Sequence, residues 1–451
     1  MTVLEFPRKS LIDRQLVNAL ASRLGDVLAE ERLDRRARNT ADPTNDEEHN
    51  FARTALHAEL LRLSATRRSE GRAVLTVVDE AEITSAAIAQ VLGLGRLQPL
   101  LEDDEISDIH VRGNAPVWVK LRNGVREMRE PIVENDDELI ELIRRAATRL
   151  SRQERRFDAG TPELNMQLPD GSRLFATMEV SLRPSLVIRR HRFEISSLNE
   201  LRIRGMLTVD LQNFLTAAVQ ARRNIVIAGG TGSGKTTLLR ALINEVPITE
   251  RLVTIEDAYE LGLDHFEHLH PDHDSLQSRP ANVEGQGEVT LADLTRMALR
   301  MDPDRVIVGE VRGAEAFPML MAMSQGNNGS MCTMHADSTR SVFPKLAAYV
   351  SMASTGLPID TVNLLLAGAL HFVIYISSSG SERRVASVRE VVDSEGANII
   401  SNEIFTSNSR GELVQAFPLR ESTRELLSSF NYDGSDDGNF DSNYNHDRSS
   451  Q

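Results

Sequence analysis

The spacing of hydrophobic residues divides the chain into segments with different periods. Over residues 11–28 apolar side chains recur three or four positions apart, which predicts an amphipathic helix, and residues 51–66 repeat this spacing. Residues 38–49 are polar and contain a proline, so we expect a linker between the two helices. The pattern predicts a helical N-terminal module over residues 1–95, and nothing in it points to chemistry.

The period then shortens, which predicts an α+β domain over residues 96–200. Apolar and polar residues alternate imperfectly over Ile106–Val111, and Val117–Leu121 is a second short strand-like run beyond a turn-rich stretch. A helical period returns over Asp136–Leu150. Further short strands are expected at residues 164–168, 173–178 and 185–190.

Short apolar runs alternate with helical patterns over residues 201–425. The runs at residues 224–228, 252–255 and 305–308 are apolar except for one residue each, Asn224, Thr254 and Arg305. Continuously apolar strands separated by helices are typical of a parallel sheet covered on both faces, so the fold class is α/β. The segment 426–451 is expected to be a disordered tail, because from Asn431 onward Asn, Asp, Ser and Gly predominate.

Composition narrows the classes of protein that remain. The 451 residues carry a net charge of −15, which repels phosphate backbones, so no direct contact with nucleic acid is expected. One cysteine, Cys332, excludes a disulfide scaffold, and we expect it to be a small core residue.

The longest apolar run, Val362–Ile376, is too short to cross a bilayer. We expect a cytoplasmic protein that reaches the membrane only through a partner.

The strongest motif is a phosphate-binding loop between a predicted strand and a predicted helix. Residues 229–236 read GGTGSGKT and fit the pattern G-x-x-x-x-G-K-[ST]. Lys235 is expected to reach the β- and γ-phosphates of ATP, and the Thr236 hydroxyl to ligate Mg²⁺. The alternative is a glycine loop that only makes a tight turn. The residues expected to bind the nucleotide are Gly229, Gly230, Thr231, Gly232, Ser233, Gly234, Lys235, Thr236 and Thr237.

Acidic residues follow two of the predicted parallel strands. Glu310 ends the strand that begins at Arg305, and Glu256 and Asp257 follow the strand that begins at Leu252. Because ligands of open α/β sheets lie at the carboxyl ends of the strands, these carboxylates should lie near the loop and hold water or metal. The alternatives are a helix cap or ion pair for Glu310 and an N-cap for Asp257.

Histidines supply two further candidates. His335 stands at an expected strand end, where it could sense the γ-phosphate or donate a hydrogen bond to it; a structural histidine is the alternative. Residues 264–274 contain four histidines and several carboxylates. Their spacing matches no zinc template, so we expect a solvated loop or an edge strand there.

Taken together, the motifs resemble the secretion ATPase superfamily of type II and type IV systems. The resemblance extends over about residues 97–415 and rests on four sequence blocks. They are the phosphate-binding loop, Thr254–Asp257, Leu299–Arg312 and Gly326–Asp337. The third of these, Leu299–Arg312, is highly specific. Upstream, Leu168–Arg173 and Leu186–Arg190 match as well.

This resemblance implies a homohexameric ring whose subunits join an N-terminal α+β domain to a RecA-like ATPase domain, with nucleotide between the two. Glu310 matches the family's catalytic glutamate, Glu256 and Asp257 match its acidic box, and His335 matches its histidine box. Arg189 and Arg190 match a basic segment from which arginines approach the phosphates, although both could simply be solvated.

Three features distinguish this chain from parts of that superfamily. Asn327 replaces the first histidine of the histidine box, Gly313 replaces a usual aspartate, and the tetracysteine zinc element is absent. The stretch Gly309–Ala316 looks more like the Tad/Flp pilus or conjugative-transfer branch.

We therefore expect an ATP- and Mg²⁺-dependent hexameric motor that powers Tad/Flp-type pilus assembly or protein secretion through an inner-membrane platform protein. The alternative within the superfamily is a type IV secretion or conjugation traffic ATPase. Alternatives of other classes are a RecA-like nucleic-acid translocase, which the acidic charge disfavours, and an assembly factor without turnover, which Lys235, Thr236 and Glu310 disfavour.

Overall fold

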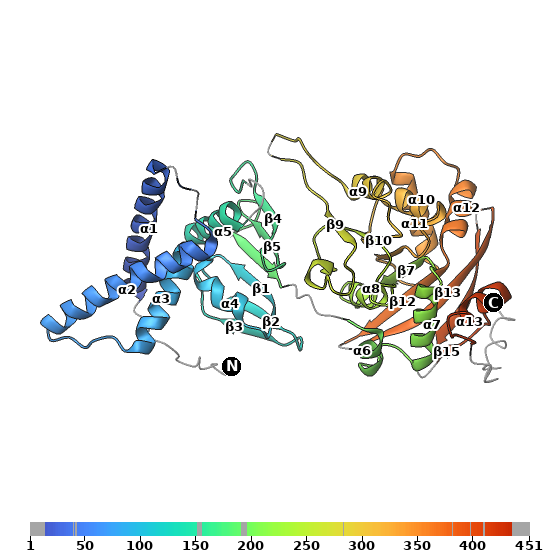
Figure 1. Ribbon diagram of the computed structural model, residues 1–451, viewed down its shortest axis with the longest axis horizontal. Helices are drawn as coiled ribbons and strands as arrows, with labels where there is room; N and C mark the ends of the chain where they lie inside the picture. Colours follow the sequence, from blue (N-terminus) through green and yellow to red (C-terminus); the bar gives the residue numbers. More distant parts are fainter. Residues whose placement is uncertain are drawn as a thin grey trace. The chain divides into compact units, whose positions relative to one another are not determined.

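The computed structural model describes residues 14–38, 40, 43–150, 156–190, 196–282, 284–380, 382–396, 398–408 and 411–434 (Figure 1). They belong to two compact units, Met1–His191 and Arg192–Gln451. Leu427 and Tyr432 are buried, so packed structure continues almost to residue 434. The remaining residues of the expected disordered tail, 435–451, lie outside the described residues.

Unit 1 begins with three helices that share a small apolar core. They are α1 (Arg14–Ala37), α2 (Asn45–Ser69) and α3 (Val77–Leu92). Leu24, Leu56 and Ile83, one from each helix, are among the buried residues of this core. The first helix continues nine residues beyond the predicted end because its polar extension is supported by pairs such as Glu31–Arg35, 2.9 Å apart.

The rest of unit 1 is a six-stranded antiparallel sheet with the order β3-β2-β1-β6-β5-β4. The strands are β1 (Ile106–Arg112), β2 (Val117–Leu121), β3 (Arg126–Arg129), β4 (Glu163–Gln167), β5 (Arg173–Thr177) and β6 (Ser185–Arg189). The helical elements are η1 (Gly95–Leu97), α4 (Gln98–Glu102) and α5 (Asp136–Leu150). One stripe of α5, including Leu139, Ile143 and Ala146, is buried in the same core as the sheet, which explains the helical period seen there.

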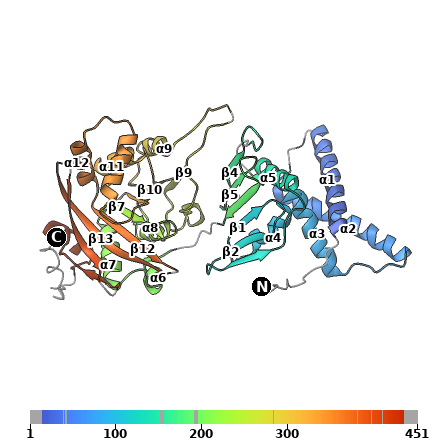
Figure 2. The ribbon, with the colours of Figure 1, turned by 180° about the vertical axis from the view of Figure 1, so that it is seen from behind.

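Unit 2 is built on a nine-stranded sheet with the order β15-β14-β13-β12-β7-β11-β10-β8-β9. The strands are β7 (Ile225–Gly229), β8 (Leu252–Glu256), β9 (His273–Gln277), β10 (Arg305–Val311), β11 (Met331–Met334), β12 (Phe372–Ser379), β13 (Glu382–Glu395), β14 (Asn398–Ser407) and β15 (Leu413–Gln415). Strands β7 to β12 pair in parallel, as the sequence predicts, whereas β12 to β15 pair antiparallel. The long strands β12 and β13 run side by side in both views (Figures 1 and 2).

Helices cover both faces of this sheet. They are α6 (Leu198–Ile203), α7 (Val209–Gln220), α8 (Lys235–Ile243), η2 (Leu263–His265), α9 (Leu291–Ala298), α10 (Ala316–Ser324), α11 (Val342–Met352), α12 (Ile359–Ala369) and α13 (Glu421–Ser428). Ile225 and Ile227 of β7 belong to the core beneath α6, α7 and α8, whereas Val226 and Ala228 belong to the core beneath α9 to α12. The central strand is apolar throughout because alternate residues enter different cores.

Residues 362–376, the longest apolar run, are divided between α12 and β12. Across the described ranges, no helix is both long enough and apolar enough to traverse a bilayer.

Candidate active site

The phosphate-binding loop connects the central strand β7 to helix α8, in the context that its motif requires. Gly234 precedes the helix in the left-handed region, with φ 97° and ψ 18°, which a glycine adopts without strain. A Cβ on Gly229 would lie 2.6 Å from Ser233 Oγ and 2.8 Å from the Ile376 carbonyl oxygen, so a side chain has no room there. The loop thus keeps its backbone accessible and places the positive end of α8 beside it.

Lys235 is buried at the first position of α8, with 7% of its surface exposed. Its Nζ donates to the carbonyl oxygens of Gly229, at 3.1 Å, and of Gly230, at 2.9 Å. Burial lowers the pKa of this ammonium group, and the carboxylates of Glu310 and Glu260 act in the opposite direction. The lysine charge is therefore held inside the loop by backbone dipoles and nearby carboxylates.

His335 connects Lys235 to Glu310. The lysine Nζ lies 3.3 Å from His335 Nδ1, and His335 Nε2 lies 2.9 Å from Glu310 Oε1. A lysine ammonium can only donate, so Nδ1 accepts and Nε2 carries the proton that it shares with Glu310. Three motifs separated by up to 100 residues in sequence thus meet at one edge of the sheet.

Strand order explains how these three groups meet. β11 lies between β7 and β10, so His335, directly after β11, stands between the loop after β7 and the end of β10. The β10–β11 register shifts between Val308 and Val311, around Glu310. The Thr333 hydroxyl donates to the Gly309 carbonyl at 2.6 Å and ties the two strand ends together. The sequence pattern does not predict a role for Thr333, although a polar residue two positions before His335 was the available signal.

Glu256 lies in a different environment from Glu310. Only 3% of its surface is exposed, and its Oε1 accepts from the backbone N–H groups of Glu260, at 2.8 Å, and Leu261, at 2.9 Å. Burial raises its pKa to about 7. The sequence pattern predicts that this carboxylate holds water or metal, but in the structure it points inward and binds the loop after β8.

Asp257 remains at the surface of this edge and is engaged on both oxygens. Oδ2 lies 3.0 Å from an Arg312 guanidinium nitrogen, and Oδ1 accepts from the Ser278 hydroxyl at 2.7 Å. Residues 258–262, all of them described, form no helix, so Asp257 caps none. Arg312 belonged to a recognised sequence block, but its pairing with Asp257 was not anticipated.

Arg189 and Arg190 belong to unit 1, whereas the loop belongs to unit 2. Arg189 ends β6 and lies 3.4 Å from the Asp108 carboxylate, with 64% of its side chain exposed. Arg190 donates its backbone N–H to the Ser107 carbonyl at 2.9 Å and its guanidinium to the Asp103 carbonyl. Arg189 has the more accessible guanidinium of the two.

The remaining residues that the sequence singles out lie at different places in unit 2. Thr236 and Thr237 occupy the first turn of α8 and are partly exposed, whereas Cys332 is buried in β11, as predicted. Asn327 precedes β11 and donates to the Pro303 carbonyl, so it lies at the opposite end of that strand from His335. It therefore stabilises a turn away from the phosphate-binding loop.

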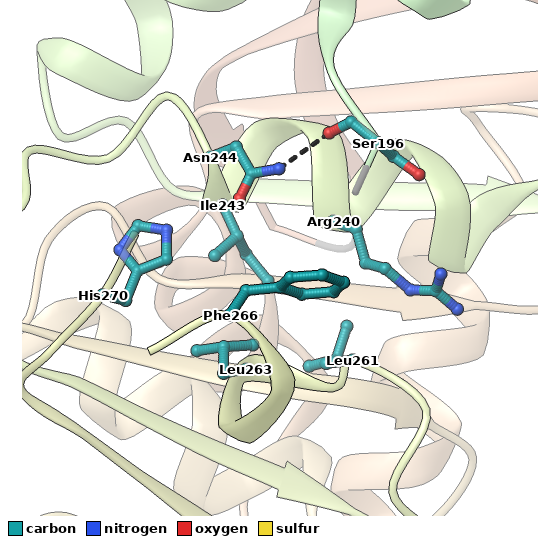
Figure 3. Close-up of a pocket in the computed structure, with 8 residues that line it drawn as sticks. All are labelled: Ser196, Arg240, Ile243, Asn244, Leu261, Leu263, Phe266 and His270. Atoms are coloured by element: carbon teal, nitrogen blue, oxygen red, sulfur yellow. Dashed lines mark hydrogen bonds between the residues drawn. The ribbon is translucent and has the colours of Figure 1, made fainter. Parts of the chain in front are cut away.

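The histidine-rich segment is a loop that leads into the edge strand β9. His273 begins the edge strand β9 and pairs with Asp264 at 2.8 Å, as the expectation of a loop or edge strand requires. His270 is buried and lines a small pocket together with Arg240, Asn244 and Phe266 (Figure 3). In the part of the chain that the structure describes, no three His, Cys, Asp or Glu side chains gather as a metal site.

Comparison with known proteins shows which family and which relatives this chain resembles. The family model described as "Type II/IV secretion system protein" matches residues 89–428. The type IV secretion system protein VirB11 of Brucella suis is 30% identical over 348 residues, which cover 70% of this chain and 94% of VirB11. A Mycobacterium tuberculosis protein, provisionally named for conjugal transfer, is 35% identical over 317 residues, covering 68% of this chain and 87% of its own length. The crystal structure of the Brucella suis VirB11 ATPase with sulphate covers 65% of this chain and 94% of its own, with 30% identity and a TM-score of 0.35.

Proposed function

The chain belongs to the type II/IV secretion system protein family, and from this premise we propose that its ATPase activity drives a hexameric motor. Within the family it is an ATPase of the type IV secretion or pilus kind. The motor would convert ATP hydrolysis at the loop Gly229–Thr236 into movement of a secretion or pilus-assembly machine.

The contact chain from Lys235 through His335 to Glu310 carries this proposal. Lys235 supplies a positive charge for the β- and γ-phosphates, and the carboxylate of Glu310 orients water and accepts its proton. His335 holds Glu310 in place through Nε2, at 2.9 Å, and also faces the lysine that binds the phosphates. A tight turn without catalytic purpose would need neither a buried lysine nor a histidine bridge to a carboxylate.

Mg²⁺ suits the oxygen groups at this edge of the sheet. It would be held by the Thr236 hydroxyl and, through water, by the Asp257 carboxylate, which Arg312 and Ser278 keep in position. The bound ion would neutralise charge that develops on the phosphates. Because Mg²⁺ in nucleotide sites keeps waters and phosphate oxygens as ligands, one or two protein oxygens are enough.

We further propose that six copies form a ring that contacts an inner-membrane platform protein and thus associates with the membrane peripherally. The motifs that resemble the hexameric secretion ATPases support this proposal. So does the separation of the chain into two units, because a motor of this kind needs parts that can move relative to one another.

Two candidate systems could use this motor, pilus assembly and type IV secretion or conjugation. The stretch Gly309–Ala316 favours Tad/Flp-type pilus assembly. The names of the relatives favour the second candidate, a type IV secretion or conjugation traffic ATPase. Deleting the gene in its host separates the two: loss of pili with normal DNA transfer supports the first candidate, and the reverse supports the second.

Single-turnover hydrolysis tests the catalytic assignment. Glu310→Gln keeps the size of the side chain but removes the base, so ATP cleavage should slow about 100-fold or more while ATP binding stays within a few-fold of wild type. Quench-flow measurement with enzyme in excess over labelled ATP gives the rate, and equilibrium titration gives the affinity. Equal rates in wild type and variant would contradict the motor proposal.

A further inference from the structure

A β-hairpin lies against the phosphate-binding loop on the side away from His335. Strand β12 pairs with β7 on one side while β11 pairs with it on the other, and Ile376 of β12 stands opposite Gly229. The hairpin partner β13 is tied to the same region because the Val385 N–H donates to the Met206 carbonyl at 3.1 Å. The beginning of the loop is therefore flanked by a second element, for which the sequence pattern predicts no role.

Arg383 extends from this hairpin onto the loop. It pairs with Ser378, two residues past Ile376, so it stands beyond the last residue of β7. Its Cδ lies 3.5 Å from the position that a Cβ on Gly234 would take. The Met206 methyl group lies 3.4 Å from the same position. The guanidinium group begins one bond beyond Cδ, and it is thus within reach of a ligand on the loop.

The direction of the side chain follows from strand geometry. Arg383 lies on the same face of β13 as Val385, which is buried in the core that includes α8. Arg384 points to the opposite face, where its guanidinium pairs with Glu382 at 3.0 Å. Arg383 is exposed, and its side chain makes neither a hydrogen bond nor an ion pair with any described residue, so its charge is available for a ligand.

We propose that Arg383 binds the α- and β-phosphates of ATP and ADP from the hairpin side. The inference rests on the proposed nucleotide site. Guanidinium groups bind phosphate oxygens through paired hydrogen bonds, and the Cδ that carries this one lies beside Gly234, the residue before α8. Glu310 and His335 approach from the β11 side, where water would attack the γ-phosphate. Arg383 approaches from the β12 side and therefore contacts phosphates that do not react.

Such a contact is equally strong before and during the reaction. Arg383→Ala should therefore raise the Kd for ATP and ADP on the order of 10-fold and raise KM similarly, while kcat stays within about twofold of wild type. AMP, which lacks the β-phosphate, should lose less affinity than ADP. Arg383→Lys should recover part of the loss, because it retains the charge without the paired donors.

The neighbouring arginine provides the matched control. Titrations of full-length protein with fluorescent ATP and ADP and with unlabelled AMP should show Arg384→Ala within twofold of wild type. Equal affinities for the Arg383→Ala and Arg384→Ala variants would overturn the proposal, as would equal losses for AMP and ADP, which would indicate a contact to the nucleoside. Lys235→Ala distinguishes the premise: if it also binds ATP normally, the proposed nucleotide site itself is wrong.

Discussion

Glu256 and Glu310 show how the same side chain acquires different properties at the ends of neighbouring strands. Glu256 lies on the same face of β8 as Leu252 and Thr254, which is the face that α8 covers. Its carboxylate is therefore buried, and it accepts two backbone hydrogen bonds. Glu310 lies where the register of β10 shifts, and its side chain is 38% exposed beside His335. One therefore stabilises a loop, and the other is available for chemistry.

The raised pKa of Glu256 makes stability depend on pH. Its folded pKa, about 7, exceeds the ordinary value of 4.5 for a glutamate, mainly because burial disfavours the charged form. Between these values the folded state holds a proton that the unfolded state has lost. The proton held by Glu256 therefore favours the folded state. This contribution to the free energy of unfolding is fully present below pH 4.5 and is lost as the pH rises through 7. It amounts to about 3 kcal/mol, at about 1.36 kcal/mol per pKa unit.

Glu256→Gln isolates this effect because glutamine keeps an oxygen acceptor for the N–H groups of Glu260 and Leu261 but does not ionise. We expect the free energy of unfolding of wild type to fall between pH 5 and pH 8 by about 2–3 kcal/mol more than that of the variant. Urea unfolding of the full-length protein at both pH values measures this difference. Parallel pH profiles for the two proteins would contradict the burial argument.

Among the secondary-structure elements, the beginning of β10 is held by a buried ion pair. Arg305 is fully buried, donates to both carboxylate oxygens of Glu250 at 2.7 and 2.9 Å, and donates to the Val219 carbonyl at 2.8 Å. The turn before β11 passes directly over it. Gly329 in this turn has a φ of 90°, and a Cβ there would lie 2.6 Å from an Arg305 guanidinium nitrogen.

Gly329→Ala should therefore destabilise unit 2. The added methyl group would strain the left-handed backbone at this position. It would also displace a buried arginine that three hydrogen bonds hold in place. We therefore expect the free energy of unfolding to fall by about 3 kcal/mol or more. Gly368→Ala is the matched control, because nothing lies within 4 Å of a Cβ at that position in α12. Thermal unfolding should show a lower Tm for the first variant and an unchanged or slightly higher Tm for the second. A Tm for Gly329→Ala equal to wild type would contradict this packing argument.

At the scale of the whole molecule, we propose that unit 1 contributes an arginine to hydrolysis in unit 2. Arg189, whose guanidinium is exposed at the end of β6, is our candidate for a group that acts on the phosphates in the transition state. Arg189→Ala should then lower kcat at least 10-fold with little change in ATP affinity, and Arg190→Ala should have a smaller effect because its guanidinium is bound to the Asp103 carbonyl.

Arg126→Ala, in the edge strand β3 of the same sheet, serves as the control and should leave both quantities unchanged. Steady-state kinetics and ATP titration, performed at a protein concentration where mass photometry shows hexamers, provide the measurements. A proportional loss of affinity and rate in Arg189→Ala would indicate an ordinary ligand contact. A protein that turns over ATP at full rate as a monomer would contradict the ring.

The sequence by itself determined the features that depend on neighbouring residues. The loop Gly229–Thr236 was recognisable because its glycines, lysine and threonine are consecutive, and the parallel strands were recognisable because their apolar runs are continuous. That Glu310 and His335 lie near the loop followed from the rule that parallel strands end at one edge.

Only the tertiary structure decided which carboxylate faces outward and which arginine reaches the loop. The orientation of Glu256 depends on which face of β8 is covered by α8, and that of Glu310 depends on a register shift against β11. The place of Arg383 depends on the pairing of β12 with β7, residues about 150 positions apart. These features come from strand order and register, which are set by packing between distant segments rather than by local sequence.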